Sequence, residues 1–552
     1  MNGLTILAFA IVVLFLGYRV YARWLERTWG INPNAKTPAQ LLNDGKDYTP
    51  ANKWSVFAHQ FTSITGAGPV TGPIIAAMFG WLPALLWILF GSIFFGCVQD
   101  FSALYASVKS GGKSIGSIIE EHIGRTGRQL FLLFCWLFTI LVIAAFCDMV
   151  ANTFNGFTSS GEHIVPNAAA ASISMIYMLG AVLFGLYLKY RKPGSAEQLG
   201  VGITLMLVML WLGIEYPLFA DAETWRYVVF AYLFAASVMP MWLLKQPRDY
   251  LSMFLLIGMI LGGVIGVFIQ NPSLNLPAFV GFEVNGMDLF PMLFVTIACG
   301  AVSGFHSLVS SSTSSKMVAN EQDMKLVGYG SMAVEAVLGV IALIVVCAAA
   351  SNGALPKGTP FQLFSSSIAT FMTDIFGMPT HIAACVMTMC VSALALTSVD
   401  AVARIGRMSL QELFTPPAHQ EKTAVQKLFT NTVFATSLTL VLGFILCMAG
   451  YMSVWPLFGS ANQLLAALVL TAIAVFMKAT GRKGWMLYFP MGFMLLVTMT
   501  AIGMTIWRIF ATIANDTFVF MVGGLQLILA FALIALAVLV VYHSVIKLSA
   551  KN

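Results

Sequence analysis

The chain has 552 residues, of which 59% are hydrophobic and 9% are charged, and its formal net charge is +6. Soluble domains average about 45–50% apolar and about 25% charged residues, so this composition excludes a soluble globular protein, a disordered chain and a nucleic-acid-binding protein. It is typical of an all-α polytopic membrane protein, whose helices cross the bilayer many times.

The first apolar run starts at the N-terminus without the basic residues that precede the core of a cleaved signal peptide, so we expect it to stay as the first transmembrane helix. Glycine, proline and charge clusters divide the remaining chain into runs long enough to cross a bilayer. The apolar piece 361–376 is too short and is predicted to be a surface helix. We expect about 15 transmembrane helices, at residues 4–22, 56–79, 82–108, 129–155, 168–188, 198–215, 226–243, 250–270, 288–314, 328–350, 380–398, 428–449, 455–477, 486–511 and 518–546.

The basic residues follow this alternation closely. With the N-terminus outside, all 29 Lys and Arg residues except Arg226, Lys357 and Arg508 fall on the inner side. Basic residues gather on the cytoplasmic side of membrane proteins, and a wrong number of spans would scramble the pattern. We therefore predict that the N-terminus lies outside and the C-terminus inside.

The second span contains three glycines and two prolines between Thr65 and Pro73, which is incompatible with a regular helix. Secondary transporters bind substrate at such interrupted helices, where carbonyl groups are free for a cation and N–H groups for an anion. The alternative is close packing of helices through small residues. The segment follows no strand, which excludes a dinucleotide site. The substrate-binding candidates here are Thr65, Gly66, Ala67, Gly68, Pro69 and Thr71.

A second break is predicted in the seventh span, at Ser237-Val238-Met239-Pro240-Met241-Trp242, although one proline can mean only a kink. The second and seventh spans run in opposite directions, and their starts are five helices apart. This register predicts a five-plus-five inverted-repeat, LeuT-like core at residues 56–400, with repeats at about 56–215 and 226–400. Residues 1–55 then hold the first helix and a cytoplasmic linker, and residues 401–552 a cytoplasmic loop and four further helices. Ser237 and Met239 join the substrate-binding candidates.

The ninth span is unusually polar for a membrane helix. Ser303, His306 and Ser307 lie one or two turns inside it, and are predicted to contact substrate. Ser310 and Thr313 follow in a run of hydroxyl residues, which are expensive to expose to lipid, and are predicted to bind a coupling ion. The alternative for the end of this run is a solvated helix terminus before Lys316.

Ionisable residues inside a membrane indicate function by default. Asp100, Asp148 and His306 are the candidates for ion coupling, since a histidine can carry a proton near neutral pH. The alternatives are a neutral histidine bonded to a serine, an interfacial carboxylate at Asp100, and polar contacts between helices at Asp148 and Glu335. Asp400 and Arg404 are spaced to form an ion pair on one helical face.

Neither a metal site, a cofactor nor an enzyme active site is expected. The eight cysteines lie in apolar runs without a CxxC pair, and the seven histidines are scattered. A channel is a rival to a transporter, but the sequence contains no repeated charged or carbonyl filter.

Several longer motifs make the chain resemble the carbon starvation A family over residues 30–470. The motifs are Asp47-Tyr48-Thr49-Pro50, Asn52-Lys53-Trp54, the stretch from Gly66 to Pro73, Val98-Gln99-Asp100-Phe101, Gln246-Pro247-Arg248-Asp249-Tyr250, Ser303-Gly304-Phe305-His306-Ser307, Ser314-Ser315-Lys316 and Gly459-Ser460-Ala461-Asn462-Gln463.

The resemblance implies a bacterial inner-membrane transporter that is induced under carbon limitation and takes up peptides, or pyruvate with protons. It also implies a relation to the amino acid–polyamine–cation superfamily, which has a five-plus-five inverted repeat. We therefore expect an ion-coupled symporter for a small carboxylate-bearing nutrient, with a periplasmic N-terminus. Backbone N–H groups near Gly66 and Gly68 would bind the carboxylate. Peptide or pyruvate as substrate, and H⁺ or Na⁺ as coupling ion, remain open, as does the oligomeric state.

Overall fold

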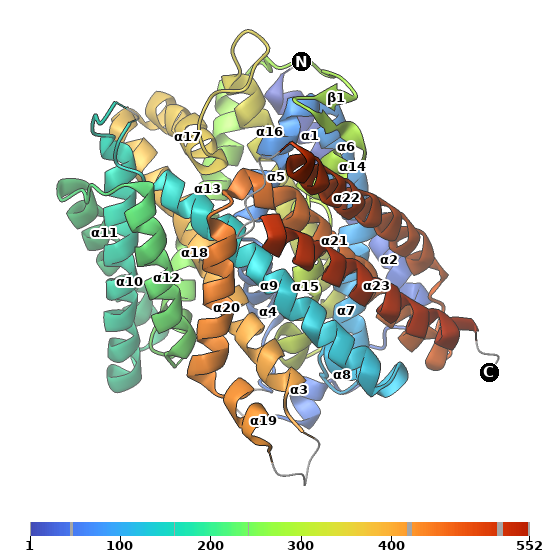
Figure 1. Ribbon diagram of the computed structural model, residues 1–552. Coiled ribbons are helices and arrows are strands. Elements are labelled where there is room, and N and C mark those ends of the chain that lie inside the picture. Colours follow the sequence, from blue (N-terminus) through green and yellow to red (C-terminus); the bar gives the residue numbers. More distant parts are fainter. Residues whose placement is uncertain are drawn as a thin grey trace. The chain divides into compact units, whose positions relative to one another are not determined.

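The computed structural model describes residues 2–44, 48–158, 160–240, 242–416, 422–515 and 523–549, and its elements are almost all helices (Figure 1). The all-α membrane class predicted from composition is therefore confirmed. Lys46, Asp47, Met241 and Lys551, which the sequence analysis used, lie outside the described residues. The exception to helix is a short hairpin of β1 (Glu283–Val284) and β2 (Met287–Asp288), in which Glu283 pairs with Asp288. Its turn, Asn285-Gly286, has positive φ at both residues, as a tight hairpin requires.

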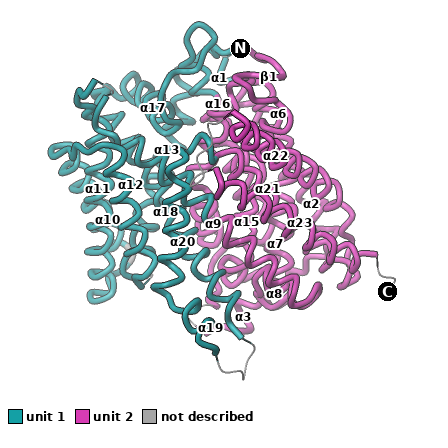
Figure 2. Tube along the Cα trace, viewed as in Figure 1, with its two compact units in different colours: residues 1–4, 139–276, 344–454 teal, residues 5–138, 277–343, 455–552 magenta. Residues whose placement is uncertain are grey.

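Unit 1, one of two compact units, comprises residues 1–4, 139–276 and 344–454 (Figure 2). Its long helices pack in sequence-neighbour pairs, α10 against α11 and α17 against α18. The helices wholly inside it are α10 (Val165–Arg191), α11 (Ser195–Glu215), α12 (Ala222–Val238), α13 (Lys245–Gln270), α17 (Pro360–Phe376), α18 (Thr380–Leu413), α19 (Ala424–Phe429) and α20 (Thr432–Cys447).

Unit 2 comprises residues 5–138, 277–343 and 455–552. π-helical turns interrupt its helices at Gly17–Tyr21, Ser92–Gly96 and Lys325–Gly330. Its helices are most of α1 (Gly3–Leu16), then α2 (Ala22–Thr28), α3 (Pro38–Leu41), α4 (Lys53–Ile64), α5 (Gly68–Ala76), α6 (Trp81–Gly91), α7 (Cys97–Lys109), α8 (Ile115–His122), α14 (Leu289–Thr296), α15 (Gly304–Ser312), α22 (Tyr488–Ala514) and α23 (Leu525–Ser549). The chain passes from one unit to the other within α9 (Arg125–Thr153), α16 (Ser331–Ala349) and α21 (Tyr451–Ala479).

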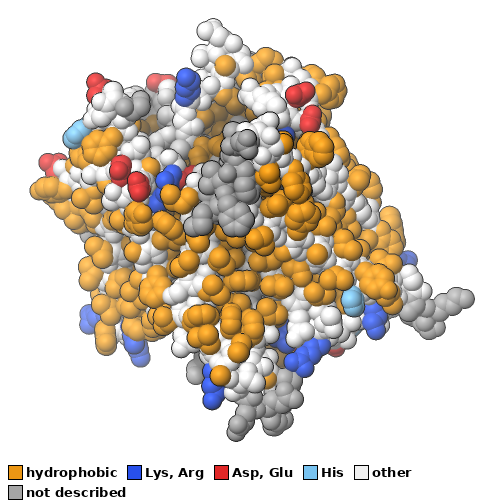
Figure 3. Space-filling model, in the orientation of Figure 1, with side chains coloured by type: hydrophobic (Ala, Val, Ile, Leu, Met, Phe, Trp, Pro, Cys, Tyr) orange, Lys and Arg blue, Asp and Glu red, His pale blue; other side chains and the backbone are white. Residues whose placement is uncertain are grey.

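Eleven helices in the described part of the chain are long and apolar enough to cross a membrane. Four predicted spans fall outside this set because their helices are interrupted or shorter: 56–79, 226–243, 288–314 and 428–449. The number of about 15 crossings therefore stays a prediction. Hydrophobic side chains cover much of the face shown in Figure 3, as expected for surfaces that contact lipid. Leu179 and Leu183 on α10 are large exposed hydrophobic residues, at 68% and 62%.

One predicted span is longer than expected, and one predicted short helix lies where it was expected. The span predicted at 380–398 continues as α18 to Leu413, so Arg404 and Arg407 lie on a helix and not in a loop. Arg404 and Asp400 form the predicted ion pair, at 3.5 Å between Nε and Oδ1. The piece predicted as a short surface helix is α17, capped at Thr359 by a reciprocal pair of hydrogen bonds with Gln362.

Candidate functional site

The predicted break in the second span is present, between α4 and α5 of unit 2. Asn52 caps the start of α4, accepting hydrogen bonds from the N–H groups of Trp54 and Ser55 at 3.0 Å. The helix ends at Ile64, and α5 restarts at Gly68 with Pro69 in its first turn. The side chain of Thr65 is buried in the break, and its hydroxyl has no hydrogen-bond partner among the described residues.

A second break lies between α14 and α15, at residues 297–303, inside the span that the sequence analysis treated as the ninth helix. The break predicted at Ser237–Trp242 coincides with the end of a helix, and not with an interruption inside one. There α12 simply ends at Val238, because Pro240 cannot continue it, and α13 starts only at Lys245. The register of the repeats 56–215 and 226–400 relied on that position, so this division stays a prediction without its main support.

Close backbone contact joins the two breaks of unit 2. A Cβ atom added at Gly68 would lie 2.4 Å from Sγ of Cys299, and one at Gly72 would lie 2.7 Å from the carbonyl oxygen of Thr296. These distances are too short for any other residue type without movement, so the two glycines allow the second interrupted helix to pack directly on α5.

Side-chain amides from α21 hold the second break open. Asn462 donates from Nδ2 to Oγ of Ser303 at 3.1 Å, and its Oδ1 accepts from the N–H of Phe305 at 3.2 Å, which caps α15. Gln463 donates from Nε2 to the carbonyl oxygen of Phe294 at 2.6 Å, near the end of α14. Two adjacent residues of α21 thus supply hydrogen-bond partners to backbone groups at both ends of the break.

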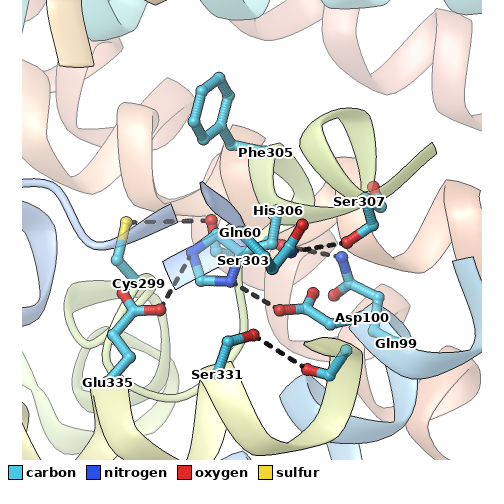
Figure 4. Close-up of polar contacts among 12 residues, drawn as sticks. Gln60, Gln99, Asp100, Cys299, Ser303, Phe305, His306, Ser307, Ser331 and Glu335 are labelled. Carbon is cyan, nitrogen blue, oxygen red and sulfur yellow. Dashed lines mark hydrogen bonds and ion pairs between the residues drawn. The ribbon is translucent and has the colours of Figure 1, made fainter. Parts of the chain in front are cut away.

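A buried chain of three ionisable side chains lies beside the second break (Figure 4). Nδ1 of His306 on α15 lies 3.1 Å from Oδ2 of Asp100 on α7, and its Nε2 lies 3.5 Å from Oε2 of Glu335 on α16. All three side chains are 0% exposed. The imidazole ring therefore bridges two carboxylates that come from different helices.

Several acceptor atoms of these side chains and of the neighbouring Gln99 have no hydrogen-bond partner among the described residues. These buried atoms are Oδ1 of Asp100, both oxygens of Glu335 and Oε1 of Gln99. Buried polar atoms normally have partners, so such a group indicates a site for a proton, water or a cation. A π-helical turn precedes each of the carboxylate-bearing helices, Ser92–Gly96 before α7 and Lys325–Gly330 before α16, a feature common at functional sites.

Residues 2–354 and 348–501 match the model of the family described as carbon starvation protein CstA. The chain belongs to that family. It is similar to the peptide transporter CstA of Escherichia coli (31% identity, covering 91% of this chain and 80% of the relative). It is also similar to the pyruvate/proton symporter BtsT of Escherichia coli (29%, covering 92% and 82%) and to the peptide transporter CstA of Bacillus subtilis (32%, covering 88% and 87%).

Two solved structures also align with most of this CstA-family chain. One is the manganese transporter of Eremococcus coleocola in complex with an aromatic bis-isothiourea substituted compound, at a TM-score of 0.47 and 13% identity, covering 92% of this chain and 98% of that one. The other is MhsT in complex with L-phenylalanine, at a TM-score of 0.48 and 12% identity, covering 90% and 100%.

The other predicted substrate-binding residues fall into two groups. Gly66, Ala67, Pro69 and Thr71 lie in or next to the first break of unit 2, but the N–H of Gly66 already donates to the carbonyl of Ile64 at 2.9 Å. Ser307 lies on α15 beside His306 and donates to the carbonyl of its own helix at Gly304. The structure does not bring Ser237 and Met239 into this cluster, since they belong to unit 1.

The two hydroxyl residues predicted to bind an ion have other partners. Oγ of Ser310 accepts from Nε2 of Gln60 on α4 at 2.8 Å, and Ser314 donates to the other end of the same amide at 2.6 Å. Thr313 is exposed and bonds the carbonyl of Val309 in its own helix. Gln60 thus ties α4 to the far end of α15.

Asp148 lies in unit 1, where both of its carboxylate oxygens have partners. Oδ1 accepts from Nε of Arg226 on α12 at 2.8 Å, and Oδ2 accepts from the N–H of Tyr451 at 2.7 Å. This is the polar contact between helices that the sequence analysis held as the alternative to ion coupling.

Replacing Asp148 by asparagine is therefore expected to lower the stability of the fold but to leave the coupling of transport to an ion gradient intact. Breaking a buried ion pair costs about 3–5 kcal/mol, and we expect the low end because the Arg226 side chain keeps 21% exposure. Thermal unfolding of the purified protein measures the loss, with Glu223→Gln, an exposed carboxylate on α12, as the matched control. A variant with unchanged stability but no response of uptake to an ion gradient would contradict this assignment.

Sequence reasoning missed several residues of the site. Glu335 was considered only as a contact between helices, although an acidic residue within an apolar run is itself a signal of function. Gln60, Cys299, Asn462 and Gln463 were not assigned to the site at all. The adjacent amides Asn462-Gln463, inside the long apolar run of α21, were the available signal.

Proposed function

We propose that this chain is a secondary transporter that imports a small carboxylate-bearing nutrient, a peptide or pyruvate, by ion-coupled alternating access. The names of its relatives, peptide transporter and pyruvate/proton symporter, support transport rather than an enzymatic activity. The observation that carries the proposal is the buried Asp100–His306–Glu335 chain beside two interrupted helices.

The charges of the three buried side chains Asp100, His306 and Glu335 favour a proton as the coupling ion. With both carboxylates ionised, the three groups retain a net negative charge even when His306 carries a proton. A buried net charge is costly, so the cluster favours uptake of a further proton or of another cation. Because an imidazole can both accept and release a proton near neutral pH, His306 suits proton transfer between Asp100 and Glu335.

The first break is the proposed place for the substrate carboxylate. At the N-terminus of α5, Val70 and Thr71 donate to the carbonyl of Ala67 and Pro69 has no N–H, which leaves the N–H of Gly68 for a ligand. The helix dipole favours a negative charge there. Thr65 adds a buried hydroxyl without a described partner. We also propose a part in binding for Ser303 of the second break, whose Oγ lies 3.9 Å from Sγ of Cys299, the atom that a Cβ at Gly68 would meet.

The proposed setting is the bacterial inner membrane during carbon starvation, with the N-terminus in the periplasm and the C-terminus in the cytoplasm. The family description supports the physiological role, and the distribution of Lys and Arg along the sequence supports the orientation.

Uptake by proteoliposomes that hold the purified chain tests this function. Labelled pyruvate and a labelled dipeptide are offered in parallel, with either an inward pH gradient or an inward Na⁺ gradient. Accumulation above the equilibrium level with the pH gradient is the expected result, and it identifies the substrate. Accumulation driven only by Na⁺ would overturn the proton assignment, and no accumulation of either substrate under any gradient would overturn the proposed function.

A further inference from the structure

Three arginines gather at the C-terminal end of α12 in unit 1, and none of the three was assigned to transport above. Arg404 on α18 donates from Nη2 to the carbonyl oxygen of Ala236, and Arg407 donates from Nη1 to that of Ser237 at 2.6 Å. These two contacts satisfy carbonyl groups that the end of the helix leaves open.

The third arginine is Arg248, in the motif Gln246–Tyr250 at the start of α13. Its side chain is only 1% exposed, and its Nη2 lies 3.0 Å from Oδ2 of Asp400 and 3.5 Å from Oδ1 of Asp249. Its Nη1 donates to the hydroxyl of Tyr232. Asp400 thus bridges Arg248 and Arg404.

The positive charges of this cluster outnumber the negative ones. Asp249 also pairs with Lys245, at 2.9 Å, so the two carboxylates face three arginines and a lysine. The carbonyl ends of α12 supply only about half of one negative charge. Uncompensated charge is costly in a largely buried place, which leaves room for an anionic partner.

The same cluster contains hydrogen-bond donors without acceptors. Nε of Arg248, Nε of Arg407 and Oγ of Ser237 are buried atoms with no partner among the residues that the structure describes. Ser237 itself is 0% exposed. An anion with several oxygens would supply both the missing charge and the missing acceptors.

We propose that this arginine cluster, formed by Arg248, Arg404 and Arg407 with the hydroxyl of Ser237, binds a phosphate group. Guanidinium groups match the oxygens of phosphate with paired hydrogen bonds, and basic pockets between membrane helices bind lipid headgroups. The surroundings favour a lipid as the source. Nζ of Lys189 lies 3.6 Å from the ring centre of Trp242, a pair typical of the membrane interface, and Val238 at the end of α12 is 40% exposed.

Thermal unfolding of the purified full-length chain in detergent tests the site. Phosphatidylglycerol, phosphatidylcholine and inorganic phosphate are added separately. Phosphatidylglycerol is expected to raise the unfolding temperature by about 3 °C at a hundredfold excess over its dissociation constant, and phosphatidylcholine by far less. If inorganic phosphate raises the unfolding temperature and phosphatidylglycerol does not, the site is supported, but its ligand is a soluble phosphate and not a lipid. No shift beyond that of phosphatidylcholine with either phosphate compound would overturn it.

Two variants tie the shift to the cluster. Arg407→Gln removes the guanidinium group of Arg407 but leaves the ion pairs of Asp400 with Arg248 and Arg404 intact. Ser237→Ala removes only a hydroxyl group, so it provides a folded variant if Arg407→Gln is unstable. Each is expected to lose at least half of the shift. Arg191→Gln, an exposed arginine that pairs with Glu197, should keep all of it. Full retention of the shift in both cluster variants would overturn the proposal.

Discussion

Replacing His306 by alanine is expected to abolish gradient-driven accumulation of substrate. The imidazole is the link between Asp100 and Glu335, which lie on different helices and have no other described route for a proton between them. We expect at least a tenfold loss of pH-driven uptake in proteoliposomes. Glu335→Gln keeps the size of the side chain but removes its charge, and is expected to lose the response to the pH gradient while substrate exchange without a gradient continues.

The exposed His381 provides the matched control, because His381→Ala changes the same residue type at the start of α18. It should leave uptake unchanged. Normal pH-driven accumulation by His306→Ala, at normal expression, would remove this residue from the coupling mechanism. Loss of exchange as well as accumulation in Glu335→Gln would point instead to a structural role for the carboxylate.

Adding a single methyl group at Gly68 is expected to reduce transport at least tenfold. The new Cβ would lie 2.4 Å from Sγ and 2.6 Å from Cβ of Cys299, so the two interrupted helices would have to separate. Because the obstruction is one side chain, Cys299→Gly combined with Gly68→Ala should recover a substantial part of the activity. Initial rates of uptake by the single and double variants measure the effect.

Gly503→Ala on α22 is the control, since a Cβ added there meets nothing within 4 Å. It should transport normally. Full activity of Gly68→Ala would show that close contact at this point does not matter for transport. A double variant no better than Gly68→Ala would show that the two breaks are coupled through something other than the Cys299 side chain.

The first break could be predicted because its cause is local. Pro69 lacks an N–H group and stands in the first turn of a new helix, so the chain leaves the helix just before it, among glycines. The predicted interruption up to Pro73 is too long, because α5 continues through Pro73 to Ala76. The second break could not be predicted in the same way, because residues 297–303 contain no proline. Asn462 holds it open from 159 positions away in the sequence, a contact that local composition does not encode.

The ionisable candidates show the same limit. Asp100, Asp148 and His306 could each be found as a charge in an apolar run, but the sequence did not indicate which of them share a site. The structure pairs Asp148 with Arg226 and joins His306 to Asp100 and Glu335. Partner choice depends on how helices pack, and helix packing was the part that the sequence left open.

The two ends of the short helix α15 are held by different residues. Asn462 binds its first turn, while Gln60 binds the other end through the hydroxyls of Ser310 and Ser314, and Ser107 donates there to the carbonyl of Ser311. A tilt of roughly 10° about the first turn moves the far end of the helix by about 2 Å, given a rise of about 1.5 Å per residue. Such a displacement is enough to release both bonds to Gln60. The contacts with Asn462 and with Gln60 thus lie at opposite ends of the helix that carries His306, and a small tilt can break the second set while the first is kept.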